Sequence, residues 1–253
     1  MCLLLIANKT HKKYKLIIAA NRDEFYERPT AAAEFWEDNP MVLAGRDLRG
    51  GGTWLGITKR GRVAAITNYR SGLLQKENAP SRGDLTKNFL ISDISPQEYY
   101  NLIKRNAGDF NKFNLVFGTT DELFYYSNVT GIFEKIDEGI SGLSNCLLNT
   151  PWPKVSTSIK KLQNLLSGDP EESPLMDILA DPMEFPDNLL PDTGIPVELE
   201  RYLSAVFIKT PVYGTRASTI IRVSNQNEVH FVEKTFGKDG FTGKKEYNFF
   251  LND

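Results

Sequence analysis

The sequence predicts an α+β fold built on antiparallel sheets. Strand-like apolar runs are grouped at both ends of the chain and in its middle, and helical patterns are grouped between them, with no regular β-α-β alternation. A chain of 253 residues with 41% hydrophobic residues can bury a large core. Because no internal repeat or linker-like segment interrupts it, we expect a single domain over residues 1–253.

The first third of the chain is predicted to consist of strands joined by turns. Residues 2–7 and 15–20 are apolar runs on either side of a short polar stretch, which indicates a hairpin of buried strands. Residues 62–67 and 53–58 form a second pair of this kind. The two pairs favour antiparallel rather than parallel sheets, because such short connections cannot make a crossover.

Helices and further strands follow in blocks. A helix is expected at about residues 84–91, and Ser95-Pro96-Gln97-Glu98 combines an N-cap serine, a proline at the first helical position and the glutamate of a capping box. A loop rich in proline and acidic residues is expected at 181–196. The other expected elements are strands at 114–119, 123–127, 131–136 and 143–148, helices at 155–166, 174–179 and 198–207, and strands at 218–223, 229–235 and 246–251.

The composition limits the kinds of binding partner and the cellular compartment that we expect. The formal net charge is −2, from 30 basic and 32 acidic residues, so no electrostatic footprint for nucleic acid or an anionic membrane is present. Two cysteines make no disulfide framework, and no zinc-binding pattern of Cys and His occurs. Residues 2–7 are too few to span a membrane, and no basic region precedes them as in a signal peptide. We therefore expect a cytoplasmic protein with a small-molecule substrate or ligand, no membrane span and no metal.

Cys2 is the residue that suggests chemistry. If Met1 is removed, this residue carries both a thiol and the free α-amine, which supplies a nucleophile and a general base together. Such an amine titrates at roughly 7.7–8.0 and can accept a proton near neutrality. The alternative is that Cys2 simply begins a buried strand as a small apolar residue. Cys146, among apolar neighbours, is interpreted as a structural thiol.

The histidines do not suggest a second base. His11 lies in the polar turn between the first two strands, and His230 lies in an alternating strand. A Ser-His-Asp or Cys-His site is therefore poorly supported, which leaves the N-terminal amine as the expected base for Cys2.

Polar residues at strand ends are the other candidates. Asn21, Arg22 and Asp23 follow an apolar strand directly and form either a turn or a group that orients a substrate or a terminal ammonium. Asn68 and Asn149 each end an apolar run, where a side-chain amide can stabilise an oxyanion.

Arg216 lies among small residues at the start of a strand, which suits the binding of a carboxylate or the support of a nucleophile. An ordinary surface arginine is the alternative interpretation of this residue.

Several motifs together resemble the NRDE family, which includes the transport and Golgi organisation protein 2 group. The resemblance covers essentially the whole chain, in the motifs Met1-Cys2-Leu3, Asn21-Arg22-Asp23-Glu24, Ala44-Gly45-Arg46-Asp47, Gly51-Gly52-Thr53-Trp54-Leu55-Gly56, Thr67-Asn68-Tyr69-Arg70, Ser81-Arg82-Gly83, Ser144-Asn145, Pro151-Trp152-Pro153-Lys154 and Tyr213-Gly214-Thr215-Arg216. It implies a four-layer αββα sandwich, with two antiparallel sheets between helical layers, as in N-terminal-nucleophile (Ntn) hydrolases.

A more distant likeness to penicillin V acylases and bile salt hydrolases implies the roles of individual residues. It implies a cysteine hydrolase that cleaves non-peptide C–N bonds without a cofactor, with the catalytic residues Cys2, Asp23, Asn68, Asn149 and Arg216. Those hydrolases carry an arginine three residues before the aspartate, whereas this chain has Ala20 there and Arg22 beside Asp23. The substrate-binding residues expected with this site are Asn21, Arg22, Trp54, Tyr69 and Arg70.

The alternative is a binding or trafficking protein on the same fold, for haem or for an acyl-CoA or lipid. Haem would need an axial ligand, and His11, His230 and Cys2 are the few residues that could supply one. The sequence does not predict the oligomeric state.

Overall fold

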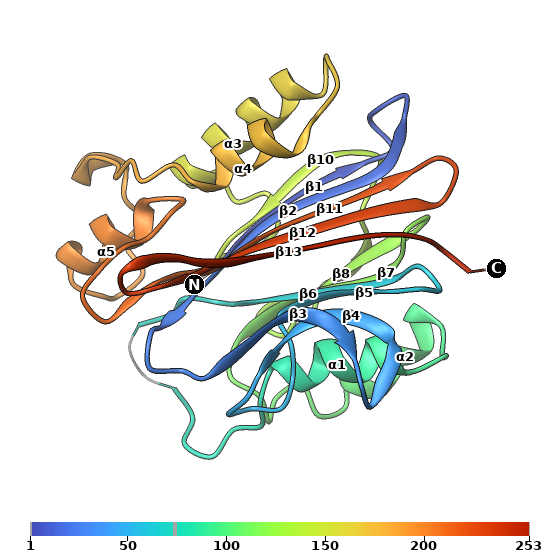
Figure 1. Ribbon diagram of the computed structural model, residues 1–253. Coiled ribbons are helices and arrows are strands. Elements are labelled where there is room, and N and C mark those ends of the chain that lie inside the picture. The colour runs from blue at the N-terminus through green and yellow to red at the C-terminus, as the bar shows by residue number, and fades with distance from the viewer. Residues whose placement is uncertain (1, 73–74, 253) are drawn as a thin grey trace.

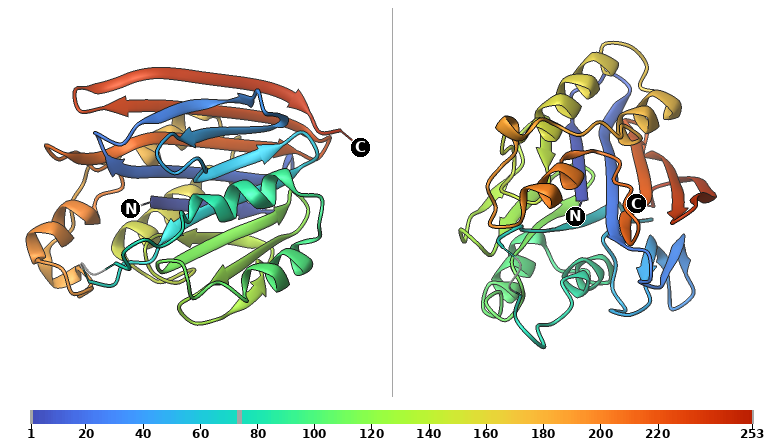
Figure 2. Two further views of the ribbon diagram at one scale, coloured as in Figure 1. Left: turned by 90° about the horizontal axis from the view of Figure 1, so that it is seen from below. Right: turned by 90° about the vertical axis from the view of Figure 1, so that its left-hand side faces the viewer.

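The computed structural model describes residues 2–72 and 75–252, which form the four expected layers (Figure 1). Two stacked sheets lie in the middle, with one pair of helices covering the outer face of each (Figures 1 and 2). The fold is therefore the αββα sandwich that the family resemblance implied.

The first sheet has six antiparallel strands, in the spatial order β10 (Gly139–Leu143), β1 (Cys2–Asn8), β2 (Tyr14–Phe25), β11 (Tyr213–Ser224), β12 (Glu228–Gly237) and β13 (Gly240–Phe250). The second has seven antiparallel strands, in the order β3 (Thr30–Trp36), β4 (Asn39–Asp47), β5 (Leu55–Thr58), β6 (Arg62–Asn68), β7 (Phe113–Thr119), β8 (Leu123–Ser127) and β9 (Phe133–Lys135). The helices are α1 (Gly83–Ile91), α2 (Pro96–Ile103), α3 (Pro153–Leu165), α4 (Glu172–Leu179) and α5 (Val197–Ser204), with a short 3-10 turn at Asp187–Leu189. No helix of the described residues is both long enough and apolar enough to cross a membrane.

Alternation along the central strands decides which side chains face which layer. On β1, Leu4 and Ile6 pack between the two sheets, whereas Leu3 and Leu5 pack under α3 and α4. A separate apolar cluster packs α1 and α2 against the second sheet. Both faces of each sheet are thus buried over most of their length, which explains why β1 is an almost unbroken apolar run.

Most expected elements are confirmed, including the capping box of α2, in which Ser95 accepts from the backbone of Glu98 and the Glu98 carboxylate accepts from the backbone of Ser95. The turn considered for residues 21–24 is wrong, because these four residues continue strand β2. These residues pair with β11, so their backbone groups are satisfied in the sheet despite the turn preference of Asn and Asp.

Two other strand predictions differ from the structure. The strand expected at 143–148 lies earlier, as β10, because Leu143 pairs with Leu4 and only two described residues of β1 lie beyond that pair. Strands β3 and β4 were not predicted, since β3 is a half-exposed edge strand without clear alternation.

Glu233 of β12 joins the two sheets through a buried carboxyl group. One oxygen accepts the backbone N–H of Ala33 in β3 at 2.7 Å, and the other accepts the hydroxyl of Thr219 in β11 at 3.1 Å. Burial raises the pKa of this carboxyl from 4.5 to about 7. The neutral form is therefore favoured in the folded protein more than in the unfolded chain.

This shift predicts a pH-dependent stability. The contribution of Glu233 is fully present below about pH 4.5 and is lost as the pH rises through about 7, because the folded pKa lies above the unfolded value. The complete loss is roughly 3 kcal/mol. We expect Glu233→Gln, which cannot ionise, to be more stable than wild type at pH 8 but similar at pH 5 in urea unfolding. The exposed Glu228→Gln is the control, and equal pH dependence in wild type and Glu233→Gln would contradict the assignment.

Candidate functional site

Cys2 lies at one end of the sandwich, directly opposite Arg22 in the antiparallel pairing of β1 with β2. By alternation its side chain is on the same face as Leu4 and Ile6, which point between the sheets. Arg22 has the same parity as Ala20, which also packs between the sheets. The thiol of Cys2 and the guanidinium of Arg22 therefore share one face of neighbouring strands.

The likeness to penicillin V acylases expects an arginine at position 20, and Arg22 lies on the same face of β2 as that position. Positions 20 and 22 lie on the same face of β2, so the arginine stands two residues further along that face rather than on the other one. The positive charge of Arg22 favours the thiolate form of Cys2.

Asp23 lies next to Cys2 but faces the helical layer. It is 4% exposed, and its Oδ1 accepts the hydroxyl of Thr215 at 2.7 Å, while its backbone carbonyl accepts the hydroxyl of Tyr213 at 3.0 Å. Burial raises the pKa of the Asp23 carboxyl, and the nearby charges of Lys154 and Arg22 oppose that rise. A carboxylate held in this way can accept hydrogen bonds from an ammonium group.

Burial also raises the pKa of the Cys2 thiol. Cys2 is half-buried, and the charge of Asp23 raises its pKa further, whereas a hydrogen bond from the backbone of Asp23 and the charge of Arg22 lower it. The thiol needs a base or additional positive charge to react at neutral pH.

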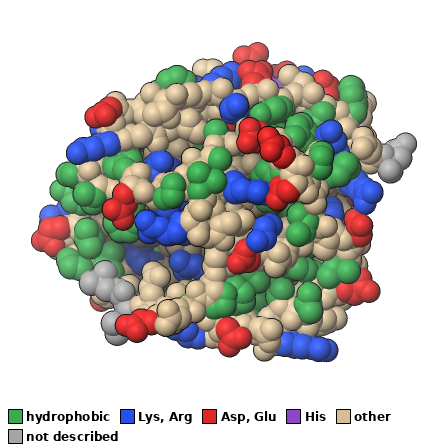
Figure 3. Space-filling model, turned by 60° about the horizontal axis from the view of Figure 1, so that its bottom comes forward, with side chains coloured by type: hydrophobic (Ala, Val, Ile, Leu, Met, Phe, Trp, Pro, Cys, Tyr) green, Lys and Arg blue, Asp and Glu red, His purple; other side chains and the backbone are tan. Residues whose placement is uncertain are grey.

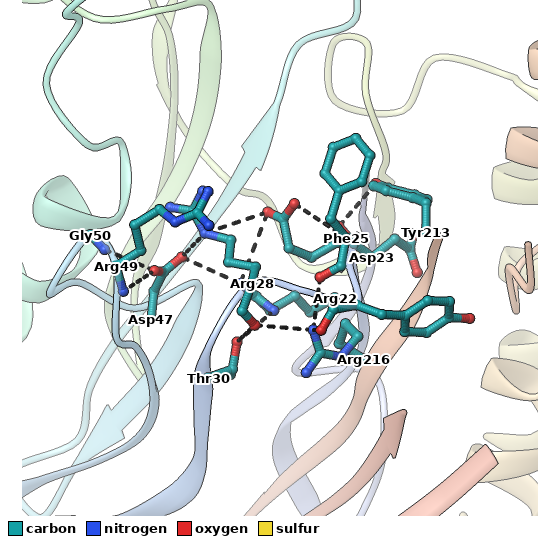
Figure 4. A network of polar contacts seen from close by, with 12 residues as sticks. Arg22, Asp23, Phe25, Arg28, Thr30, Asp47, Arg49, Gly50, Tyr213 and Arg216 are labelled. Carbon is teal, nitrogen blue, oxygen red and sulfur yellow. Dashed lines mark hydrogen bonds and ion pairs between the residues drawn. The ribbon is translucent and has the colours of Figure 1, made fainter. Parts of the chain in front are cut away.

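Arg22 is itself fixed by an ion-pair network (Figure 4). Its Nη2 lies 3.3 Å from Oδ2 of Asp47, which also accepts from Nε of Arg28 at 2.6 Å. The other oxygen of Asp47 accepts the backbone N–H groups of Arg49 and Gly50. Although burial acts to raise it, these donors leave the pKa of Asp47 lowered, so the network is ionised at neutral pH.

Trp54, expected to bind substrate, packs against the side chain of Arg22. Its ring centroid lies 4.5 Å from the Arg22 guanidinium carbon, in a cation-π contact across the two sheets. The ring fits only because residue 45 is glycine, since a Cβ there would lie 2.2 Å from a ring carbon. A cavity of about 130 Å³ lies beside Trp54, and Arg216 and Glu233 are among its lining residues.

Arg216 binds backbone carbonyls at the end of β2. It sits at a bulge of β11, and its guanidinium donates to the carbonyl oxygens of Phe25 and Arg28 (Figure 4). It also donates to the carbonyl oxygens of Tyr26 and Phe236. It therefore holds the loop that positions Arg28. Its catalytic role stays a prediction.

The two asparagines predicted for an oxyanion site lie in different places. Asn68 ends β6, and its backbone carbonyl accepts the side chain of buried Asn145 at 2.7 Å. Ser144, beside Asn145, donates to the carbonyl of Cys2 at 3.0 Å. The segment 144–145 thus connects Asn68 to Cys2.

Asn149 is exposed, with a φ of 59°, and its Oδ1 accepts the backbone N–H of Gly142 at 2.9 Å. Gly142 pairs with Leu5, three residues along β1 from Cys2 and hence roughly 10 Å away. The structure therefore brings Asn68 toward Cys2 through Asn145 and ties Asn149 to the sheet edge.

The remaining predicted binding residues are engaged with the protein. Asn21 is buried, donates to the carbonyls of Leu179 and Val206 at 2.8 Å and accepts from Ser218, so it joins β2 to the helical layer. The hydroxyl of Tyr69 lies 4.0 Å from the sulfur of Cys146, which is half-buried rather than a fully buried core thiol. Their roles in substrate binding remain predictions.

Arg70 forms a buried ion pair that the sequence did not suggest. It pairs with Glu200 of α5, and both side chains are almost fully buried. Its guanidinium also lies 4.9 Å from the ring centroid of Trp152. Glu200 also accepts the backbone N–H of Thr193 at 3.2 Å. The ion pair of Arg70 with Glu200 therefore holds α5 and the segment before it over the end of the sandwich that contains Cys2.

Sequence reasoning did not select Lys154 or Glu200. Lys154 carried a signal, because it is a cation in the first turn of α3, where the helix dipole disfavours positive charge. Glu200 carried none, because an acidic residue is favourable in the first turn of α5, and only its burial in the structure marks it.

The histidines and acidic side chains do not make a good metal or haem site. Within residues 2–72 and 75–252, the single group of three ligand-type side chains is Glu172, His230 and Glu246. Lys244 lies 2.9 and 2.8 Å from the two carboxylates, and Arg222 donates to Nδ1 of His230 at 2.6 Å. That bond fixes the proton on Nε2, which faces Glu246 at 3.1 Å and so cannot offer a lone pair.

His11 is engaged as well, because its Nε2 lies 2.9 Å from the carbonyl of Gly168. Neither histidine favours the haem-binding alternative.

Lys and Arg side chains gather around a hollow on the face shown in Figure 3. Arg82 contributes a further charge near Cys2, since burial lowers its pKa while the charges of Cys2 and Glu24 act to raise it. The candidate site is thus a cysteine among several fixed cations, with Asp23 buried behind it.

Comparison with known proteins identifies the relatives of this chain. The family model described as Transport and Golgi organisation 2 matches residues 1–238. The Transport and Golgi organization protein 2 homolog of Bos taurus is 37% identical over 242 residues, covering 88% of this chain and 87% of the relative. The Homo sapiens homolog is 37% identical over 243 residues with the same coverage.

A solved structure confirms the fold. An N-acylethanolamine-hydrolyzing acid amidase ortholog of Caenorhabditis elegans matches with a TM-score of 0.53 at 11% identity, covering 87% of this chain and 92% of the amidase. This likeness shows that the chain shares the architecture of Ntn hydrolases, as expected.

Removal of Glu200 should release the segment that covers the site. Glu200→Ala takes away the carboxylate that balances the buried charge of Arg70, a loss expected to cost about 3–5 kcal/mol. Limited proteolysis within 181–212 and thermal unfolding would measure it. The exposed Glu198→Ala on the same helix should change stability by no more than about 0.5 kcal/mol. Equal protease resistance of the two variants would show that this ion pair does not hold α5.

Proposed function

The chain belongs to the Transport and Golgi organisation 2 family, and from its site geometry we propose that it is a cysteine Ntn hydrolase that cleaves a non-peptide C–N bond of a small acyl compound. The observation that carries the proposal is the position of Cys2, opposite Arg22 and beside buried Asp23. A cysteine that only filled a strand would not need charges of both signs around it.

The first chemical step would be attack of the Cys2 sulfur on the carbonyl carbon of the amide. Once Met1 is removed, the α-amine of Cys2 takes the thiol proton and gives it to the leaving amine. The C–N bond breaks, and a thioester remains on Cys2. Water then attacks the thioester carbonyl, with the same amine as base, and releases the acid and the free thiol.

The surrounding residues would divide the remaining tasks. Asp23 would accept hydrogen bonds from the α-ammonium group and hold it beside the sulfur. Arg22 would stabilise the thiolate by its fixed charge.

An amide donor at the oxyanion would contribute roughly 2.7–4 kcal/mol to transition-state binding. Of the two predicted donors, Asn68 has the better support, because Asn145 and Ser144 connect it to Cys2. Asn149 and Arg216 would support the sheet edge and the Arg28 loop that shape the site.

The substrate class follows from the cavity and the related fold. The cavity is lined by Trp54, which contacts Arg22, and not by Cys2 itself, and its volume suits a small part of a substrate rather than a peptide. The amidase with the shared fold hydrolyses N-acylethanolamines by its name, so N-acyl amides of graded acyl length are the first substrates to test.

Loss of the Cys2 sulfur should abolish turnover. We expect Cys2→Ala to lower kcat/KM for an N-acyl amide by roughly 10³-fold or more, because no other group can form the thioester. Release of the amine is the measurement. Cys146→Ala is the matched control and should retain activity. Equal turnover by Cys2→Ala and wild type would exclude the mechanism.

A blocked N-terminus should have the same effect without changing the thiol. A fusion that leaves residues before Cys2 should be inactive, since the α-amine is then an amide and cannot accept a proton. Cleavage by a protease that leaves Cys2 first should restore turnover, with intact mass confirming the new terminus. Full activity of the uncleaved fusion would show that another group is the base.

A further inference from the structure

The cavity beside Trp54 is lined by two side chains of opposite charge. Its volume of about 130 Å³ is smaller than the roughly 300–1,000 Å³ of pockets for drug-sized ligands, so it suits a small molecule. Glu233 of β12 and Arg216 of β11 both line it, together with the hydroxyl-bearing Thr30 and Thr235. Among the residues that the structure describes, neither Glu233 nor Arg216 lies within 4.0 Å of an oppositely charged side-chain atom. The two charges are therefore not neutralised by each other or by another ion pair.

Glu233 is a buried carboxyl group whose partners are neutral. It is 1% exposed, and in the described part of the chain its oxygens accept one hydrogen bond each, from the backbone N–H of Ala33 and from the hydroxyl of Thr219. An ionised carboxylate offers about four acceptor positions, so further donors can still bind. Neutral donors alone do not offset the desolvation of a buried carboxylate, whereas a cation can. The ammonium group of a ligand in the cavity would supply that cation.

Arg216 has the complementary deficit. Its Nε donates to one backbone carbonyl and its Nη1 to three, those of Phe236 and of Phe25, Tyr26 and Arg28. All four acceptors are neutral, and the Nη2 nitrogen donates to none of the residues that the structure describes. A guanidinium forms its strongest hydrogen bonds with carboxylate or phosphate oxygens. A ligand carboxylate would therefore complete the bonding of Arg216 from the cavity.

We propose that this cavity binds a small zwitterion of the amino acid class, with its ammonium group at Glu233 and its carboxylate at Arg216. A ligand with one charge would leave either the acid or the guanidinium uncompensated. The inference goes beyond the proposed function, because Cys2 does not line the cavity and binding requires neither its sulfur nor a free α-amine. A substrate that reached into this cavity would need the same two charges at that end.

Calorimetric titration of the intact protein with L-alanine tests the inference. Ethylamine lacks the carboxylate of alanine and propionate lacks its ammonium group, while both have a similar size. We expect alanine to bind at least about tenfold more tightly than either analogue, because only alanine pairs with both side chains. Absence of binding by alanine at millimolar concentrations would show that the cavity holds water alone and would overturn the proposal. So would an affinity of either analogue equal to that of alanine.

The pH dependence of binding identifies the partner of the ammonium group. Burial raises the pKa of Glu233 to about 7, so its ionised fraction increases roughly tenfold from pH 6 to pH 8. Alanine stays zwitterionic over this range, and its affinity should therefore rise by up to about tenfold. The other charged or titratable groups around this carboxyl are Arg22 of β2, Arg216 of β11, Tyr247 of β13 and the exposed Glu34 of β3. Guanidinium groups do not titrate in this range, and the pKa of Tyr247 is raised above 10.

A neutral variant of Glu233 separates its charge from its shape. Glu233→Gln should weaken alanine binding at pH 8 at least about tenfold and remove the pH dependence, because no carboxylate is left to ionise. The exposed Glu228→Gln on the same strand is the control and should bind like wild type. Equal affinity of Glu233→Gln and wild type at pH 8 would contradict the assignment. If Glu233→Gln does not fold by circular dichroism, the comparison of alanine with its two analogues decides alone.

Amide turnover, assayed separately, distinguishes the two proposals. Cys2→Ala should bind alanine as tightly as wild type. Alanine binding without any amide hydrolysis would uphold this inference and reject the hydrolase. Turnover that depends on Cys2, in a protein that does not bind alanine, would do the reverse.

Discussion

The register between β1 and β2 is the constraint on which the candidate site depends. Both strands are central in their sheet and apolar on both faces over most of their length, so a slip by one residue would move every buried side chain to the wrong layer. That register places Cys2 opposite Arg22. Alternation then sends Arg22 between the sheets and Asp23 toward the helices. The cysteine thus meets a cation on one face and a carboxylate on the other.

The end of the sandwich around Cys2 is where the fold accepts buried charge. Elsewhere the space between the sheets is filled mainly by aliphatic and aromatic side chains, with the carboxyl group of Glu233 among them. Here Asp47 balances Arg22 and Arg28, while Glu200 balances Arg70. Buried pairs of this kind contribute little net stability, because desolvation offsets most of their attraction. Their concentration beside one cysteine is better explained by the chemistry they allow than by a contribution to folding.

The sequence was most informative where local signals and burial agree. The apolar runs of β1 and β7 and the capping box of α2 were visible in the residues themselves. It was least informative where the neighbouring strand decides the structure. Asn21 and Asp23 are residue types that favour turns, yet pairing with β11 keeps them in β2. Edge strand β3 lacks the alternation that marks a half-buried strand, since much of it touches solvent on both faces.

By itself the sequence determined the family and the antiparallel α+β class, and it singled out Cys2 and Asp23 as candidate site residues. Only the tertiary structure decided which other groups reach them. It linked Asn145 to the backbone of Asn68 and Ser144 to the backbone of Cys2, and it tied Asn149 to Gly142 at the edge of the sheet. The reason is that alternation and pairing are local rules, whereas charge compensation acts through space. The buried ion pair of Arg70 with Glu200, for example, joins residues 130 positions apart in the chain, which no local pattern of the sequence predicts.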